Sequence, residues 1–490
     1  MSPTRAAPQV AIIGAGWAGL AAAVAATQAG MRVSLYEAAR EPGGRARNVP
    51  VKVRSGAALA QGLSLDNGQH ILIGAYRASL DLMRTVGADP SACLQRVPLD
   101  LRDAAGNGLA LPDWPAALQP LAGAWAIMSA RGWRWQTRWA LLRALRQWQR
   151  QGFQAPSSMT VTQLCQQLPE ELVQQWVDPL CVAALNTPIE QASAQVFLRV
   201  LQDSLAGAPG SADMLLPAKP LGDVLAQPAW QWLQQRGAQL VLGQRIDRLE
   251  PVAPERVGGS AAAWQLQGQC FDAVLLACPA WEAVRLLSRL AQAEGGALVG
   301  AAASQPVSVD LPQAASIEAW LSRAQQLEYE AIGTVFLQSL QPADQPPLPK
   351  AMLAVGDGPA QFVFDRQRLT GDAGVTAWVA STMAGDKAAL SQAVLQQAER
   401  LQARLQAQGA GSTSAGFEHV ATIVEKRATF RCIAGVQRPA MAIDAAWPTL
   451  LACGDYIDGP YPATLEAAVL SGQEAVLQLQ QVFTKAAQQG

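Results

Sequence analysis

The sequence predicts an α/β protein built on a parallel sheet, and three stretches carry this prediction. Residues 10–37 read as an apolar strand, a glycine turn, a helix of small residues and a second strand that ends in Glu37. Residues 271–279 form an apolar run closed by a proline turn, which is typical of a buried parallel strand. Residues 450–472 again give a strand, a Gly-Asp turn and a helix. Units in which strands alternate with helices build α/β folds.

Composition bounds the class of protein. A chain of 490 residues is too long for one core and predicts about two or three domains. Half of the residues are apolar and 15% are charged, so we expect a large core, and the net charge of −1 gives no argument for nucleic acid. Seven scattered cysteines without a CxxC pair, and only two histidines, argue against disulfides and metal sites and fit a reducing compartment.

Residues 10–31 carry no charge and could be mistaken for a membrane span or a signal peptide. The glycines, and the direct continuation into a second strand, argue against both. We therefore expect a cytoplasmic protein without a targeting segment.

The turn in this unit has the pattern GxGxxG, with glycines at Gly14, Gly16 and Gly19. In a dinucleotide site the first glycine permits the tight turn, the second lets a pyrophosphate approach, and the third lets helix and strand pack closely. The helix N-terminus offers N–H groups to phosphate, and Glu37 stands where a ribose-binding carboxylate belongs. A plain strand–helix–strand unit without ligand is the alternative.

The next motif is Pro42-Gly43-Gly44-Arg45, with Arg47 two residues further on. The glycine pair lets backbone approach a ligand, and an arginine here can supply charge to phosphate. A solvated basic turn is the alternative.

A polar run at residues 66–70, Asp-Asn-Gly-Gln-His, lies between apolar flanks. It predicts either an ordinary turn or a loop against a flat ring system, with Gln69 and His70 near the reacting centre. A structural histidine is nearly as plausible as a positioned acid.

Periodicity and turn residues predict the other elements. Helices are expected at 76–87, 161–185 with a break at 178–179, 192–205, 281–290 and 387–408, and a further helix after 221. Strands are expected at 49–54, within 94–111, and at 240–242, 264–271, 333–340, 351–355, 362–364, 376–381 and 422–429.

Residues 118–150 have an unusual composition. Residues 118–128 are uncharged, and residues 131–150 hold six arginines, four tryptophans and no acid. Tryptophan and arginine favour the headgroup region of a bilayer, so peripheral membrane contact, for instance with an inner membrane, is one interpretation. A pair of helices with an exposed basic side is the other.

The C-terminal unit carries Gly454, Asp455 and Tyr456, followed by a loop and a helix that begins near Thr464. Asp455 can accept hydrogen bonds from a polyol, and the helix dipole would favour negative charge on a ring carbonyl. With the N-terminal motif, this end completes a two-ended site.

Residues 14–47, 241–279 and 454–472 resemble the FAD-dependent amine oxidase and phytoene desaturase superfamily. The run at 66–70 is similar to one branch of it, the hydroxysqualene dehydroxylases, also called squalene-associated FAD-dependent desaturases. The resemblance implies a discontinuous Rossmann-like FAD-binding domain at 1–75, 215–285 and 420–490. An inserted α+β substrate domain at 76–214 and 286–419 would complete the chain.

The resemblance also implies roles for residues. The pyrophosphate would lie on Gly14, Ala15, Gly16 and Gly19, flanked by Gly44 and Arg45. Glu37 would bind the adenosine ribose, and the backbone of Ile246 would contact the adenine end. Gly454, Asp455 and the segment through Thr464 would hold the ribityl chain and ring.

The activity implied is FAD-dependent reductive dehydroxylation of hydroxysqualene to squalene in hopanoid precursor synthesis. The departing hydroxyl needs a proton, for which His70 is the first candidate, with Gln69 or Tyr456 as orienting groups. An oxidative phytoene-type desaturase, an amine oxidase, or a prenyl-binding escort protein without catalysis are the alternatives. The direction of hydride transfer and the reductant for FAD stay open.

Overall fold

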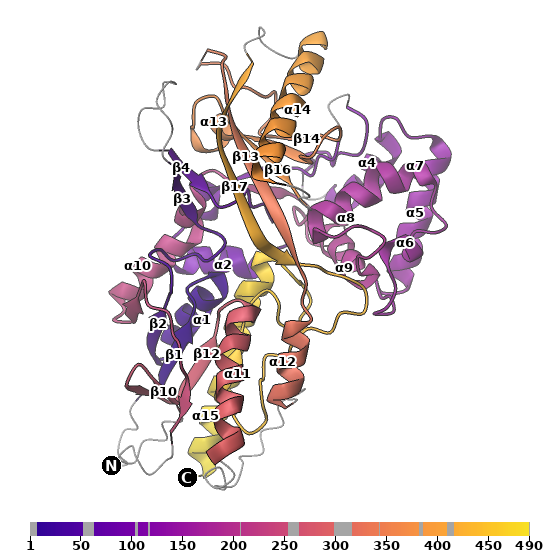
Figure 1. Ribbon diagram of the computed structural model, residues 1–490. Helices are drawn as coiled ribbons and strands as arrows, with labels where there is room; N and C mark the ends of the chain where they lie inside the picture. Colours follow the sequence, from indigo (N-terminus) through magenta and orange to yellow (C-terminus); the bar gives the residue numbers. More distant parts are fainter. Residues whose placement is uncertain are drawn as a thin grey trace.

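The computed structural model describes residues 7–51, 63–102, 106–115, 118–205, 207–252, 264–297, 316–342, 344–381, 386–408 and 416–489. A five-stranded parallel sheet organises the lower part of the molecule in Figure 1. A five-stranded antiparallel sheet stands above it, and a group of helices lies to its side. The predicted α/β fold with an added α+β part is confirmed.

The parallel sheet collects strands from both ends of the chain and from its middle. Its order is β18 (Leu450–Ala452), β12 (Ala273–Leu276), β1 (Gln9–Ile13), β2 (Arg32–Tyr36) and β8 (Gln239–Val241). Four of these strands are nearly all buried, because helices cover both faces, whereas the edge strand β8 has no fully buried residue.

Alternate residues of these strands face two different cores. On one face Ile12, beside Leu35 and Leu275, packs with helices α1 and α15. On the other face Ile13 and Leu276 pack in a second core with α11 and α12. These four helices are α1 (Trp17–Gln28), α15 (Leu465–Gln489), α11 (Ala280–Ala297) and α12 (Ile317–Gln325).

Close contact between α1 and α15 ties the two chain ends together. A Cβ at Gly472 would lie 2.2 Å from the carbonyl oxygen of Ala18, so only glycine allows this approach. The N-terminal and C-terminal halves of the predicted site are therefore held on one rigid layer.

The antiparallel sheet has the order β14 (Met352–Ala354), β15 (Phe362–Asp365), β16 (Val375–Ala380), β13 (Tyr329–Ser339) and β17 (Phe417–Phe430). One face is covered by α14 (Lys387–Ala407). The opposite face packs on β4 (Leu63–Asp66) and β7 (Met214–Pro217).

Smaller elements connect these layers. They are β3 (Asn48–Val51), β5 (Leu72–Ile73), β6 (Leu94–Val97), β9 (Glu250–Pro251), α2 (Arg77–Thr85), α3 (Pro90–Cys93), α10 (Gln227–Gln235), α13 (Arg366–Thr370) and the π-helix η2 (Gly222–Ala226). The predicted strand at 49–54 corresponds to β3, and residues 52–54 lie outside the described residues.

The lateral helical group consists of α4 (Gln119–Ser129), α5 (Trp135–Arg150), α6 (Val161–Leu164), α7 (Glu170–Leu172), η1 (Val173–Val177), α8 (Asp178–Leu185) and α9 (Ala194–Leu205). The predicted break at residues 178–179 is wrong. Pro179 falls in the first turn of α8, where its missing N–H is not needed, and the π-helix η1 leads directly into it. The interruption lies earlier, between α6 and α7.

The single strand expected at 264–271 is also wrong. It is a hairpin of β10 (Trp264–Leu266) and β11 (Gln269–Phe271). Gln267 and Gly268 both have positive φ, 50° and 79°, which is the backbone of a tight hairpin turn.

All five parallel strands come from the segments predicted for the FAD-binding domain, which supports that division as a proposal. Strand β17 crosses the proposed boundary at residue 420 and pairs with the antiparallel sheet. We therefore propose a boundary after Phe430 on this side.

Candidate active site

The glycine turn between β1 and α1 is too crowded for side chains. Gly14 has a φ of 111°, and a Cβ there would lie 2.5 Å from the carbonyl oxygen of Ala277. A Cβ at Gly19 would lie 1.8 Å from the carbonyl oxygen of Gly14. The turn consequently packs flat against β12, with the start of α1 directly behind it.

The N-terminus of α1 is bare. Gly16 is the N-cap, and no side-chain cap is present among the described residues. Gly43 donates its N–H to the carbonyl of Ala15 at 2.8 Å, and Gly44 lies against Gly16. The buried indole N–H of Trp17 finds no hydrogen-bond partner in the described part of the protein. Free N–H donors beside two glycine segments, which have no side chains to block a ligand, fit a pyrophosphate.

Glu37 fastens this turn to the end of β2. Its Oε2 accepts the N–H of Ala15 at 2.7 Å, and its Oε1 accepts the N–H of Ala39 at 2.8 Å. A carboxylate has about four acceptor positions, so it can also accept from a ribose hydroxyl.

Ile246 reaches the same edge of the sheet. The segment before it is held by Gly243, whose N–H donates to Ala39, and by Gln244, whose N–H donates to Glu37. The carbonyl of Ile246 accepts from Arg285 at 2.6 Å. The residues predicted for the adenosine end are thus brought together, with Arg285 added to them.

The other end of the site is an ion pair between Arg45 and Asp455. Arg45 Nη2 lies 2.6 Å from Asp455 Oδ1, and Nη1 donates to the carbonyl of Ala428 at 2.6 Å. Burial alone would lower the pKa of Arg45, but the charge of Asp455 and the hydrogen bond to it outweigh this effect and raise the pKa. The guanidinium also lines the large cavity described below, at its boundary with the nucleotide-binding layer.

Two residues of the run at 66–70 are structural anchors. Asp66 is buried, accepts the N–H of Leu221 at 2.7 Å, and pairs with the buried guanidinium of Arg366 at 3.0 Å. Asn67 donates to the carbonyl of Arg45 at 3.2 Å and to the carboxylate of Glu425 at 3.1 Å.

This anchoring presents Gln69 and His70 to the cavity. The Oε1 of Gln69 is buried and has no partner among the described residues. His70 Nδ1 lies 3.0 Å from the carbonyl of Gly68, and because a carbonyl only accepts, Nδ1 carries the proton. Burial, with a smaller effect of Arg45, lowers the pKa of His70. The neutral ring therefore offers Nε2 as an acceptor.

Tyr456 and Thr464 hold different positions. Tyr456 is buried, packs edge-on against Trp320, and does not line the cavity that the described residues form. Burial raises its pKa well above the usual value. Thr464 caps α15, because its Oγ1 accepts the N–H of Ala467 at 3.0 Å, and it lines the cavity. Gln69, His70 and Thr464 thus line the same cavity, whereas Tyr456 does not.

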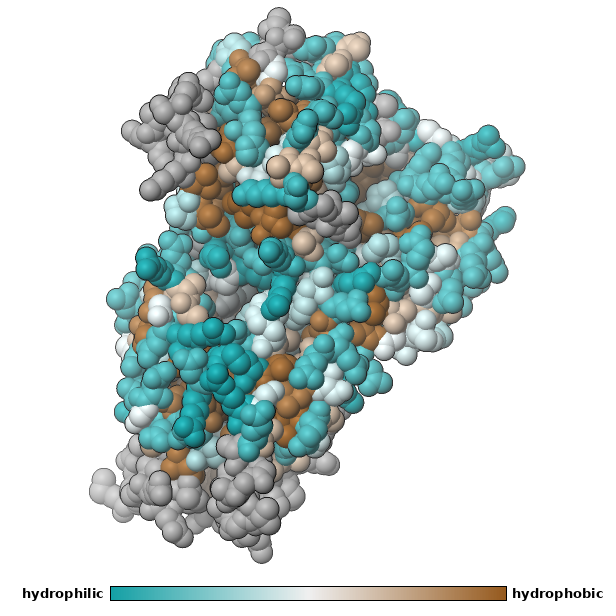
Figure 2. Space-filling model, viewed as in Figure 1, coloured by the Kyte–Doolittle hydropathy of each residue, from teal (hydrophilic) through white to brown (hydrophobic). Residues whose placement is uncertain are grey.

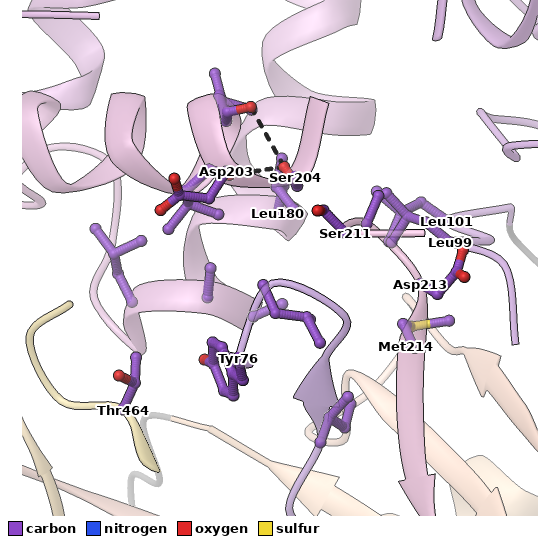
Figure 3. A pocket seen from close by; sticks show the side chains of 18 of the residues that line it. Tyr76, Leu99, Leu101, Leu180, Asp203, Ser204, Ser211, Asp213, Met214 and Thr464 are labelled. Atoms are coloured by element: carbon purple, nitrogen blue, oxygen red, sulfur yellow. Dashed lines mark hydrogen bonds between the residues drawn. The ribbon is translucent and has the colours of Figure 1, made fainter. Parts of the chain in front are cut away.

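The cavity has a volume of about 840 Å³ and lies between the helical group, the antiparallel sheet and strands β5 and β7. Its walls are mainly aliphatic and include Leu99, Leu101, Leu141, Leu145, Leu180 and Val200. Figure 3 shows Tyr76 and Thr464 facing the same hollow as Asp203, with Leu99 and Leu101 to one side.

The sequence analysis missed Arg199, Asp203 and Tyr461, which all line this cavity. Arg199 and Asp203 are four residues apart on a predicted helix, a spacing at which side chains meet, and this signal could have been used. Arg366, the partner of Asp66, has no local signal because it lies 300 residues away.

Comparisons with known proteins agree with this geometry. The model of the flavin containing amine oxidoreductase family matches residues 17–479. A hydroxysqualene dehydroxylase of Zymomonas mobilis is 24% identical over 95% of this chain and 97% of its own length. One of Rhodopseudomonas palustris is 26% identical over the same shares. The crystal structure of an oxidoreductase from Methanosarcina mazei covers 96% of this chain and 100% of its own, with a TM-score of 0.61 and 14% identity.

Proposed function

The chain belongs to the flavin containing amine oxidoreductase family and is an FAD-dependent oxidoreductase, and from this premise we propose that it dehydroxylates hydroxysqualene to squalene. The observation that carries the proposal is the cavity of about 840 Å³, whose walls are mainly aliphatic and which also receives the polar side chains of Gln69 and His70. A long isoprenoid alcohol is likewise mainly apolar and carries one polar group. Its product would serve hopanoid precursor synthesis.

The residues described above would hold the cofactor. The bare N-terminus of α1 with Gly14, Gly16 and Gly44 would take the pyrophosphate, and Glu37 the ribose. Asp455, with Arg45 paired to it, would take the ribityl side of the flavin. Bound FAD supplies two-electron chemistry and, when reduced, delivers a hydride to carbon.

His70 and Gln69 would bind the substrate hydroxyl at the cavity wall. The neutral His70 ring accepts a hydrogen bond at Nε2, so the substrate hydroxyl donates its O–H to this atom and is oriented by it. The unpartnered Oε1 of Gln69 accepts in the same way. The aliphatic walls exclude water and hold the isoprenoid chain.

We also propose that the helical group touches a membrane. Six of the nine exposed large apolar side chains in the described residues lie between 118 and 139. On α4, Leu121, Trp125 and Met128 are exposed, whereas Ala122 and Ile127 line the cavity, so one helix separates the cavity from this surface. In the part of the chain that the structure describes, no helix is long and apolar enough to cross a bilayer. The face shown in Figure 2 is mostly hydrophilic, with separate apolar patches.

A single-turnover reaction tests the proposed activity. The purified protein is reduced without oxygen and mixed with hydroxysqualene, and we expect squalene in an amount equal to the flavin that is reoxidised. If the oxidised protein instead introduces double bonds into an isoprenoid, the desaturase alternative holds. Flavin reduction by a primary amine would indicate an amine oxidase, and a colourless protein would indicate an escort.

A further inference from the structure

A charged cluster lies in the wall of the mainly aliphatic cavity. Arg199 and Asp203 face each other one turn apart on α9, with Arg199 Nε 2.7 Å from Asp203 Oδ2. Arg199 Nη2 donates to the hydroxyl of Tyr461 at 2.7 Å, so the phenolic proton is not used in this bond. The guanidinium also lies 4.7 Å from the centre of the Tyr461 ring. We call these three residues the triad.

The triad is connected to the proposed flavin site through the chain. Tyr461 belongs to the loop between Asp455 and Thr464, which is proposed to hold the flavin ring, and all three residues of the triad line the cavity. Partial burial of charged groups costs free energy unless they are paired. Aliphatic residues would fill this wall without that cost, so the triad fits a reaction that needs a polar group there.

We propose that Tyr461 donates the proton that converts the departing hydroxyl of the substrate into water, and that Arg199 and Asp203 position it. This inference rests on the proposed dehydroxylation.

The proton completes the balance of the reaction. The C–O bond breaks and its electron pair stays on oxygen, which takes the phenolic proton and leaves as water. The carbon gains a C–H bond from a hydride, whose two electrons come from the reduced flavin and ultimately from an external two-electron donor. Arg199 stabilises the resulting phenolate through its N–H at 2.7 Å, and solvent restores the proton.

His70 is less suited to this step. Its Nδ1 proton is held by Gly68, and its Nε2 carries a proton only in the cationic form, which burial and the neighbouring Arg45 disfavour. Tyr461, which faces Arg199, Asp203 and Tyr76, has a pKa raised by burial and stays protonated around neutral pH. A phenol remains a far stronger acid than water, so transfer to a departing hydroxide is favourable.

Tyr461→Phe tests the inference, with Tyr36→Phe as a matched control. The hydroxyl of Tyr36 bonds to Gln269 in the β10–β11 hairpin, and Tyr36 does not line the cavity formed by the described residues. We expect Tyr461→Phe to slow single-turnover squalene formation at least about 100-fold, while Tyr36→Phe keeps the rate. The flavin absorption spectrum of both variants should match that of the unaltered protein.

Binding and pH provide readouts besides turnover. In the oxidised protein, the preference for hydroxysqualene over squalene should fall about five-fold in Tyr461→Phe, as expected for one lost hydrogen bond. The rate of the unaltered protein should stay level between about pH 6 and 9, because a phenol is the donor. Asp203→Asn, which keeps the shape of the side chain, should slow the reaction without removing the flavin.

The outcomes separate the two proposals. If the unaltered protein forms no squalene, the dehydroxylation and this inference both fail. If it forms squalene and Tyr461→Phe is as fast and equally selective for the alcohol, the inference alone fails. A rate that falls as the pH rises through the lowered pKa of His70, and that is abolished by His70→Gln, would assign the proton to His70 instead.

Discussion

Arg45 and Asp455 are 410 residues apart in the sequence and are joined by an ion pair of 2.6 Å. Arg45 follows the glycine pair that lies against the start of α1, and Asp455 follows β18 at the edge of the same parallel sheet. The pair closes the nucleotide-binding layer where it meets the cavity. It exists only when both chain ends have folded onto each other, so cofactor binding and folding of this layer are coupled.

Asp455→Asn should weaken FAD binding. The substitution removes the charge that compensates a partly buried guanidinium, and it replaces one of the two acceptor oxygens proposed for the ribityl chain by an NH2 donor. A charge-assisted hydrogen bond contributes about 1.5–3 kcal/mol, which predicts about 10- to 100-fold weaker binding, measured by titrating the apoprotein with FAD. The control is Asp81→Asn, at an exposed carboxylate on α2 that pairs with Arg84, and this variant should bind FAD normally. Equal affinity in both variants would contradict the role of Asp455.

Features whose cause is local could be predicted from the sequence. The crowded turn at Gly14 and Gly19 follows from the GxGxxG spacing. The position of Glu37 beside this turn follows from the length of one strand–helix–strand unit. The boundaries of most helices follow from periodicity and caps.

Features that depend on distant partners could not be predicted. Nothing near Asp66 indicates that its carboxylate meets Arg366 and serves packing rather than chemistry. The strand expected at 264–271 is a hairpin because two residues adopt positive φ, one of them Gln267, for which this conformation is uncommon. The triad needs the loop at Tyr461 to reach α9, which is a tertiary contact.

Asp66→Ala should destabilise the protein strongly. Arg366 would keep a partner in Asp372, but it would lose its bond to Asp66 while only 1% of its side chain is exposed. Breaking a buried ion pair typically costs about 3–5 kcal/mol, to be measured by denaturant unfolding followed by tryptophan fluorescence. Asp81→Ala removes the exposed pair between Asp81 and Arg84 and should cost at most about 1 kcal/mol. Similar losses of unfolding free energy in both variants would show that the buried ion pair stabilises the protein no more than the exposed one.

Acidification should lower stability through the histidines. Burial lowers the pKa of both His70 and His419, with Arg45 and Lys387 acting in the same direction. The unfolded chain therefore binds more protons than the folded one below about pH 6.5. The stability that the neutral rings contribute is complete above that pH and is lost as the pH falls toward the folded pKa values.

The measurement is the melting temperature at about pH 7.5 and 5.5, on either side of the ordinary histidine pKa. Carboxylates are also protonated as the pH falls and can lower stability in the same way. The control is therefore a double variant, His70→Gln with His419→Gln, in which the carboxylates are unchanged. We expect a smaller drop on acidification in the double variant. An equal drop in melting temperature in both proteins would mean that groups other than the two histidines cause the pH dependence.

Contact with a membrane should depend on the tryptophans of the helical group. Trp125 on α4 and Trp135 on α5 are 55% and 67% exposed, and the six arginines between 131 and 150 are accompanied by no acid. Burial of the exposed part of each ring in the interface contributes roughly 1 kcal/mol, and basic residues near an anionic surface add attraction that salt screens. The protein should therefore sediment with vesicles containing phosphatidylglycerol, and less so in high salt.

Replacing both tryptophans by aspartate should weaken vesicle binding at least about tenfold. Leu477→Asp, at a 51% exposed apolar residue on α15, is the matched control and should bind as before. Because the cavity lies directly behind α4, the tryptophan variant should also turn over vesicle-bound hydroxysqualene more slowly than detergent-dispersed hydroxysqualene. Undiminished binding of that variant would mean that these helices cover the cavity without touching a bilayer.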